Sequence, residues 1–105
     1  MTPSAMFPLR RFRVEDDSMR PALEPGDYVL VNRWAYKFRP PAKGDLVVVR
    51  DPETPDRFLV KRVSDASDAG EIRVVGDNSN RSRDSRSFGP IDHLEIIGKV
   101  WIRLR

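Results

Sequence analysis

The sequence predicts a small, mostly β domain, an antiparallel barrel or sandwich with little helix. Short apolar stretches recur at regular spacing, turns rich in Pro and Gly separate them, and apolar residues at helical spacing are nearly absent. The chain has 105 residues, of which 39% are apolar and 33% are charged. This length suits one core, so we expect a single domain over residues 1–105, with 1–9 as a loose lead-in.

The turns and the alternation of side chains place each element. The strands are expected at residues 10–14, 28–31, 46–49, 57–63, 71–75 and 96–104. The first alternates Arg with apolar residues, and the second and third each follow a Gly-Asp turn. The fourth and fifth flank a turn at 65–70 and should form a hairpin. Residues 76–89 are expected to be a long polar loop, and residues 19–23 a single helical turn.

The composition excludes several kinds of chemistry. Without cysteine the chain has no disulfide, no thiolate nucleophile and no zinc–thiolate site. The single histidine, His93, rules out a multi-histidine metal site and is interpreted as a surface residue. No apolar run of 18 residues exists, and residues 1–11 hold no secretory signal. The net charge of +3 is modest, and its densest cluster, Arg81, Arg83 and Arg86, is typical of a solvated face, so no nucleic-acid partner is expected.

Lys61 occupies an unusual position for a charged side chain. Because side chains alternate along a strand, Leu59, Lys61 and Val63 share one face of the strand expected at 57–63. The pattern alone favours an amine that reaches past its apolar neighbours to solvent. The alternative is a buried amine, whose pKa falls because burial disfavours the ammonium, and which can then serve as a general base.

Ser18 is the second candidate. It follows the first expected strand, in a polar break before Met19 and Pro21. A serine there most simply caps the helical turn that begins at Met19. A nucleophilic serine needs a base within hydrogen-bond reach, and Lys61 is the best partner that this sequence offers, since a Ser-Lys pair is a variant of the catalytic triad.

The polar loop at 76–89 is the third candidate. It could be a plain surface loop or an oxygen-rich calcium loop, but its only acids are Asp77 and Asp84, and its arginines would oppose a cation. Asp84 and Arg86 could instead pair and brace the loop, holding Ser82 or Ser85 near the base. No metal site is therefore expected.

The order of these features resembles the signal peptidase family of serine proteases. The matching segments are 14–27 with Ser18-Met19-Arg20-Pro21, 43–49 with Lys43-Gly44-Asp45, 58–63 with Lys61, and 76–100 with Gly76-Asp77-Asn78 and Asp84-Ser85-Arg86. Together they cover nearly the whole chain in the order that the family uses.

The resemblance implies a role for each matching residue. Ser18 would be the nucleophile and Lys61 the general base, with Ser82 orienting the amine and Asp84 and Arg86 forming a bracing ion pair. The Ser18 backbone N–H would contribute to the oxyanion hole. The substrate would be a precursor protein bound as an extended peptide by edge pairing with strands. No cofactor is implied.

Two features depart from the family pattern. Asp16 stands where the family usually has Gly or Ser, at a position that shapes the oxyanion hole, and a carboxylate there opposes an oxyanion unless it is turned away or paired. The chain also shows neither membrane anchors nor a large inserted domain. In this it resembles the small proteases that remove the leader of nickel-type superoxide dismutase, which would make it a cytoplasmic enzyme.

Three other interpretations stay open. A leader peptidase of the signal peptidase kind could be held at the membrane by a partner or by further segments. A self-cleaving domain of the repressor type would share the Ser-Lys pair, although only about 13 residues precede Val14, too few for a DNA-binding domain. An inactive relative, disabled by Asp16, would only bind peptides. The oligomeric state is left open.

Overall fold

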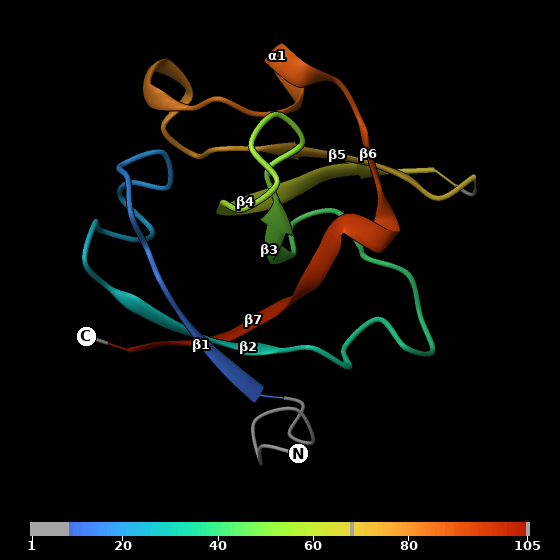
Figure 1. Cartoon of the computed structure of the whole chain (residues 1–105), viewed down its shortest axis with the longest axis horizontal. Coiled ribbons are helices and arrows are strands. Elements are labelled where there is room, and N and C mark those ends of the chain that lie inside the picture. The colour runs from blue at the N-terminus through green and yellow to red at the C-terminus, as the bar shows by residue number, and fades with distance from the viewer. Residues whose placement is uncertain (1–8, 68, 105) are drawn as a thin grey trace.

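The computed structural model describes residues 9–67 and 69–104, and within them seven strands form one antiparallel sheet (Figure 1). The strands are β1 (Leu9–Arg13), β2 (Tyr28–Asn32), β3 (Leu46–Arg50), β4 (Phe58–Ala66), β5 (Glu71–Val75), β6 (Ile91–Asp92) and β7 (Ile96–Leu104). The short helices are η2 (Ser79–Arg81), α1 (Ser85–Phe88) and η3 (His93–Glu95).

The sheet curls into half of a barrel. Its strand order is β1-β2-β7-β3-β4-β5-β6. The last strand of the chain, β7, therefore lies between β2 and β3 and connects the β1–β2 pair to the other four strands. In Figure 1, β1, β2 and β7 lie at one end of the molecule and β5 and β6 at the other. Register shifts interrupt the pairing of β2 with β7, β3 with β7 and β4 with β5, and such bulges increase twist and bend a sheet. The predicted mostly β fold is confirmed.

Strand β3 is buried on both faces because a separate apolar cluster covers each face. Val47 and Val49 belong to one apolar cluster, and Val48, which points the other way, belongs to a second. The first cluster also contains Leu59, Val63, Ile72, Val74 and Ile91, and the second contains Val14, Met19, Leu23, Val29 and Val31. The second cluster therefore holds the segment after β1 against the sheet, and Ser18 lies in that segment.

Besides small shifts at other strand ends and the unpredicted helix η3, the predicted elements differ from the structure in four places. Strand β4 continues to Ala66, so the predicted turn at 65–70 begins too early; a bulge between Val63 and Asp65 lets the strand continue through polar residues. Strand β1 begins at Leu9, inside the predicted lead-in, whose residues 1–8 lie outside the described part of the chain.

The other two differences concern short elements. The two-residue strand β6 was not predicted, because two residues are too few to show a period. The polar loop at 76–89 was predicted without structure, yet it contains η2 and α1. Helix α1 begins there because the Asp84 carboxylate caps it, accepting a hydrogen bond from the Arg86 N–H.

Candidate active site

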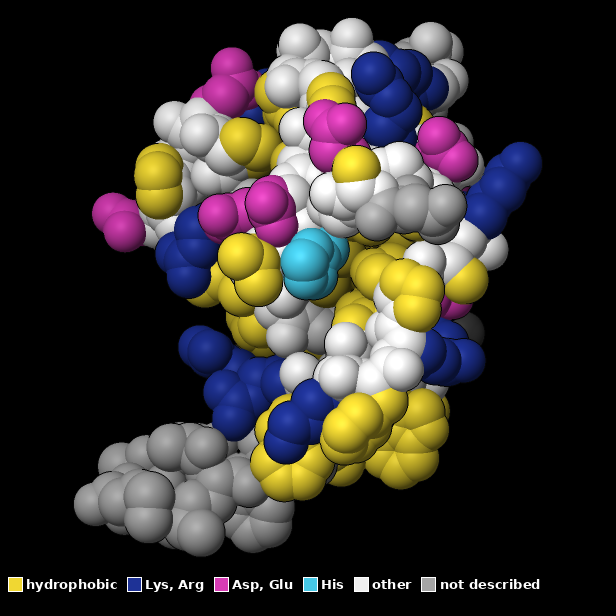
Figure 2. Space-filling view, turned by 90° about the vertical axis from the view of Figure 1, so that its right-hand side faces the viewer, with side chains coloured by type: hydrophobic (Ala, Val, Ile, Leu, Met, Phe, Trp, Pro, Cys, Tyr) yellow, Lys and Arg dark blue, Asp and Glu magenta, His cyan; other side chains and the backbone are white. Residues whose placement is uncertain are grey.

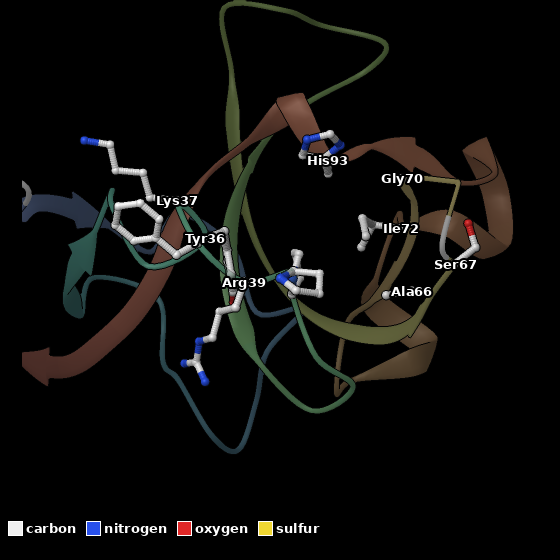
Figure 3. A pocket seen from close by; sticks show the side chains of 11 residues that line it. Tyr36, Lys37, Arg39, Ala66, Ser67, Gly70, Ile72 and His93 are labelled. Atoms are coloured by element: carbon white, nitrogen blue, oxygen red, sulfur yellow. The ribbon is translucent and has the colours of Figure 1, made fainter.

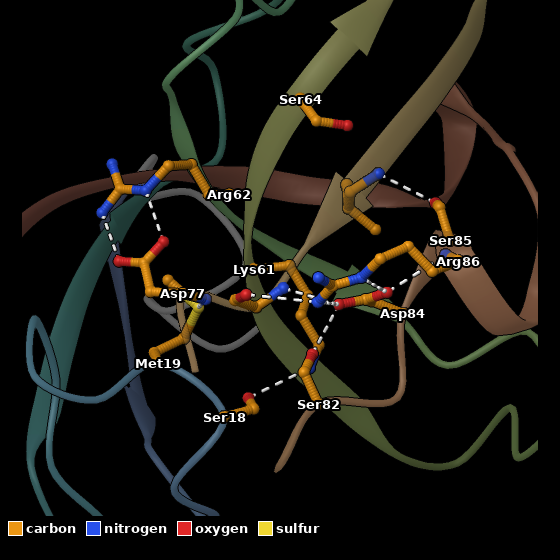
Figure 4. A network of polar contacts seen from close by, with 12 residues as sticks. Ser18, Met19, Lys61, Arg62, Ser64, Asp77, Ser82, Asp84, Ser85 and Arg86 are labelled. Atoms are coloured by element: carbon orange, nitrogen blue, oxygen red, sulfur yellow. Dashed lines mark hydrogen bonds and ion pairs between the residues drawn. The ribbon is translucent and has the colours of Figure 1, made fainter. Parts of the chain in front are cut away.

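Lys61 lies at the centre of a buried polar network. Its side chain projects from β4 between Leu59 and Val63 and is only 1% exposed, so the amine does not reach solvent as the pattern alone suggested. The Lys61 Nζ lies 3.0 Å from the Ser18 Oγ and 3.0 Å from the Ser82 Oγ (Figure 4). The alternation that predicted a shared face for Leu59, Lys61 and Val63 is confirmed, and the whole face is buried.

Ser18 reaches the amine from the segment that follows β1. Its side chain is buried, and the next residues form the predicted helical turn, in which the Leu23 N–H donates to the Met19 carbonyl at 2.9 Å. Asn78 fixes this segment from the other side. Its N–H donates to the Ser18 carbonyl at 2.8 Å, and its side-chain amide donates to the Asp17 carbonyl at 3.1 Å.

Gly76 allows these two segments to approach. A Cβ atom at this position would lie 2.2 Å from the Ser82 Oγ and 2.7 Å from the Ser18 carbonyl oxygen, distances that no side chain could accommodate. Any larger residue would therefore push Ser82 or Ser18 away from Lys61. The glycine is required here by contact with its neighbours and not by its backbone angles.

Asp84 organises the other side of the network. Its buried carboxylate accepts hydrogen bonds from the Ser82 hydroxyl at 2.6 Å and from the Gly76 N–H at 2.7 Å. Arg86 pairs with the same carboxylate through Nε at 3.0 Å and Nη2 at 2.5 Å. The ion pair predicted between Asp84 and Arg86 is present, and of the two serines offered for the position beside Lys61 it is Ser82 that lies there.

The electrostatics of the two buried groups differ in sign. Burial lowers the pKa of Lys61, and it outweighs the carboxylates of Asp16 and Asp84, which act to raise it. Burial alone would raise the pKa of Asp84, but the hydrogen bonds from Arg86, Ser82 and the Gly76 N–H hold it well below its usual range. The network therefore combines a carboxylate that stays ionised with an amine that loses its proton readily.

Asp16 is the residue whose carboxylate was expected to oppose an oxyanion unless it is turned away or paired. The Ser18 N–H, the expected oxyanion donor, donates to the Asp16 Oδ1 at 3.1 Å. The other oxygen, Oδ2, lies 3.5 Å from the Arg57 Nη2. The carboxylate is therefore paired with Arg57, but it also covers the N–H.

Two other candidates, Ser85 and His93, lie away from Lys61, and the arginine cluster is largely paired. The Ser85 Oγ accepts from the Val74 N–H at 2.8 Å, inside the fold. The arginine cluster is not a free basic surface in the part that can be described, because Arg83 pairs with Asp51 and Glu53 while Arg86 pairs with Asp84. His93 is half exposed and lines a separate cavity of about 480 Å³ with Tyr36 and Ile72 (Figure 3).

Sequence reasoning missed some contacts that shape the site. The sequence pattern placed Gly76 and Asn78 in a motif but assigned neither residue a role, and it gave no reason to single out Arg57. The steric clash that a side chain at position 76 would make with Ser18 can be seen only when the segments that hold these two residues are placed together. Within residues 9–67 and 69–104, no three His, Cys, Asp or Glu side chains gather to hold a metal ion.

The whole chain is similar to known peptidases. A family model described as signal peptidase, peptidase S26, matches residues 2–66 and 64–104. The chain belongs to this family. The resemblance to the signal peptidase family found in the sequence is thereby confirmed.

Several family members from eukaryotes are similar along most of the chain. The mitochondrial ATP-independent inner membrane protease subunit 1b of Arabidopsis thaliana is 36% identical over 109 residues, covering 83% of this chain and 64% of the relative. The mitochondrial inner membrane protease subunit 2 of Mus musculus is 33% identical over 114 residues, covering 85% and 65%. The match thus spans slightly less than two thirds of these relatives' length. None of the helices that can be described here is long and apolar enough to cross a membrane.

We predict that Asp84→Asn destabilises the protein by about 2–4 kcal/mol near neutral pH, because it removes the charge of a buried carboxylate that accepts hydrogen bonds from Arg86, Ser82 and the Gly76 N–H. Chemical denaturation measures this. Since the folded-state pKa of Asp84 is depressed, the difference from wild type persists above the unfolded-state value of about 3.9 and shrinks as the pH falls below it. Glu24→Gln, which breaks an exposed pair with Arg20, should cost less than about 0.5 kcal/mol. Equal losses in both variants would contradict the assignment.

We predict that Lys61→Met stabilises the protein by about 1–3 kcal/mol at pH 7, since an apolar side chain replaces a buried amine. The folded-state pKa of Lys61 lies below the unfolded-state value of about 10.4. Wild type therefore loses stability as the pH falls from the unfolded-state pKa towards the folded-state pKa, and the variant, which has no amine, does not. Denaturation at pH 7 and pH 10 should show the gap closing at pH 10. Lys43→Met, at an exposed position, is the control, and a gap independent of pH would refute the prediction.

Proposed function

We propose that the protein is a serine endopeptidase in which Ser18 attacks the peptide bond and Lys61 is the general base, and that it removes the leader of a precursor protein. The observation that carries the proposal is a buried amine 3.0 Å from a serine hydroxyl oxygen. Membership of the signal peptidase family supports the reaction class. Their contacts support the roles that we propose for Ser82, which orients the amine, and for Asp84 and Arg86, which brace the loop.

The hydrogen bonds run in one direction through the network. The Ser82 hydroxyl donates to the Asp84 carboxylate, so the Ser82 oxygen accepts from the Lys61 amine. A neutral amine that donates to Ser82 keeps its lone pair for a proton from Ser18. The arrangement therefore suits a Lys61 that accepts the Ser18 proton, with Arg86 holding Asp84 in place.

The reaction follows in two halves. Lys61 takes the proton from the Ser18 Oγ as this oxygen bonds to the scissile carbonyl carbon, and the negative charge moves to the carbonyl oxygen near the Ser18 N–H. The C–N bond then breaks as Lys61 returns the proton to the leaving amine. Lys61 next takes a proton from water as the water oxygen attacks the ester carbon. The bond between that carbon and the Ser18 Oγ then breaks as Lys61 returns the proton to this oxygen, which restores the enzyme.

The substrate enters along a groove between the end of β1 and the start of β4. A cavity of about 460 Å³ lies there, lined by Phe12, Arg13, Glu15, Asp56, Arg57 and Phe58. Both flanking segments lead to the reacting groups, Arg13 towards Ser18 and Phe58 towards Lys61. An extended chain bound in this groove would bring one of its peptide bonds to the Ser18 oxygen. The precursor of nickel-type superoxide dismutase is our candidate substrate.

We predict that Ser18→Ala and Lys61→Ala each lower cleavage of a supplied precursor or peptide in trans by about 10³-fold or more. The wild-type rate should rise with pH through the depressed pKa of Lys61, because only the neutral amine accepts the proton. Product analysis by mass spectrometry across a pH series measures both.

His93→Gln is the control and should leave the rate and its pH dependence unchanged. An activity limb that disappears with His93 would overturn the assignment of the base. Cleavage confined to the protein's own chain would favour the self-cleaving repressor type instead, and loss of all cleavage in wild type would favour an inactive peptide-binding relative.

We also propose that the protein works at a membrane surface and not free in the cytoplasm. Its relatives are named as inner membrane proteases. The exposed side chains of Trp34 and Trp101 line one shallow cavity with Arg39 and Lys99, and Lys37 lies over the Trp34 ring at 4.8 Å. Figure 2 shows hydrophobic side chains gathered beside Lys and Arg at the lower end of the molecule. Exposed Trp beside basic residues suits the interface of an anionic bilayer.

We predict that the double variant Trp34→Ser, Trp101→Ser binds anionic vesicles about tenfold more weakly or worse, a change of about 1.4 kcal/mol. Co-sedimentation with vesicles containing phosphatidylserine measures this, and raising the salt concentration should weaken wild-type binding because basic residues contribute. Vesicles of neutral phosphatidylcholine are the control. Equal binding of wild type and variant would favour a protein that works away from the membrane.

A further inference from the structure

The Ser18 N–H has an acceptor before any substrate arrives. It donates to the Asp16 Oδ1 at 3.1 Å, and the proposed function requires the same N–H for the oxyanion. A single N–H cannot donate at full strength to two oxygens, and a carboxylate at this distance repels a second negative charge. Asp16 must therefore leave the N–H before the tetrahedral intermediate can form there.

Arg57 offers Asp16 a second position. The Asp16 Oδ2 lies 3.5 Å from the Arg57 Nη2, too far for a strong hydrogen bond but close enough for attraction. Both side chains are nearly half exposed, at 43% for Asp16 and 49% for Arg57, so neither is locked by packing. A rotation of Asp16 towards Arg57 would exchange the bond with the Ser18 N–H for a closer ion pair.

Asp16 is the less restrained of the two carboxylates that act on Lys61. Burial has the largest effect on the pKa of Lys61, Asp16 and Asp84 oppose it, and Arg83 and Arg86 act with it. Asp84 is buried and held by Arg86, Ser82 and Gly76, whereas Asp16 is nearly half exposed and contacts the Ser18 N–H and Arg57. Moving Asp16 would therefore change the field at Lys61 without disturbing the rest of the network.

We infer that Asp16 is a positioning residue that holds the site inactive in the free protein, and that a bound substrate displaces its carboxylate from the Ser18 N–H towards Arg57. The inference rests on the proposed function for the role of that N–H. A purely structural alternative exists, because an Asp that accepts from the N–H two residues on is a common turn. Asp16→Asn separates the two, since the amide oxygen preserves the turn but carries no charge.

The test uses a peptide boronic acid that ends in alanine. The Ser18 oxygen bonds to boron, its proton passes to Lys61, and the boron becomes a tetrahedral anion like the reaction intermediate. We expect Asp16→Asn and Asp16→Ser to bind this probe about tenfold more tightly than wild type. Arg57→Gln should bind it several-fold more weakly, and this loss should vanish when combined with Asp16→Asn. Glu71→Gln, an equal change of charge at an exposed position on β5, should bind like wild type.

A second measurement needs no ligand. By NMR, the Ser18 amide proton of wild type should resonate downfield of the same proton in Asp16→Asn, because an amide oxygen is a weaker acceptor than the carboxylate oxygen. The titration midpoint of the Lys61 amine should fall in Asp16→Asn, which a merely structural role would not produce. Unchanged probe affinity in both Asp16 variants, with the Lys61 midpoint unmoved, overturns the inference. If the probe binds wild type no better than Ser18→Ala, the proposed function itself fails, while the amide signal still reports whether Asp16 covers the N–H.

Discussion

Burying the amine of Lys61 is the constraint on which the rest of the structure depends. The side chain is among the largest that the fold buries completely, and its neighbours on the strand, Leu59 and Val63, are apolar. An amine there costs free energy unless other groups bond to it. The two groups that do so, Ser18 and Ser82, stand 43 and 21 residues away in the sequence. Two separate loops must therefore be brought to the same point above β4.

The loops reach that point because they are also bonded to each other. Asn78 bonds to the backbone of Asp17 and Ser18, and Gly76 has no side chain to keep Ser82 and Ser18 apart. The Asp84 carboxylate then gathers the rest of the loop by accepting from its own neighbours. Contacts between the loops therefore set the positions of Ser18 and Ser82, while the sheet sets the position of Lys61.

How far the sequence predicts this site depends on the range of each contact. The face that Lys61 shares with Leu59 and Val63 follows from the period of a strand, but the burial of the amine does not, because the pattern alone favoured an exposed lysine. The Asp84–Arg86 pair follows from the closeness of the two residues in the chain. The meeting of Ser18 with Lys61 could be inferred only from the lack of another candidate base and from the family resemblance, since no local pattern fixes a contact across 43 residues. The pairing of Asp16 with Arg57 was not predicted at all, because it depends on the path of two turns that carry no periodic signal. Strand β6 was not predicted because two residues are too few to show the period of a strand.

The place of Ser82 between Asp84 and Lys61 has a chemical consequence. A carboxylate bonded directly to the amine would stabilise the ammonium and raise its pKa, leaving no lone pair to take a proton. Ser82 passes on the orientation set by Asp84 without bringing the two charges into contact, and Arg86 offsets the charge of Asp84 from its other side. Asp84 can therefore stay ionised and fix the geometry, while Lys61 remains free to lose its proton. A direct Asp–Lys pair would hold the amine in the same orientation but would keep it protonated, and a protonated amine could not serve as the proposed base.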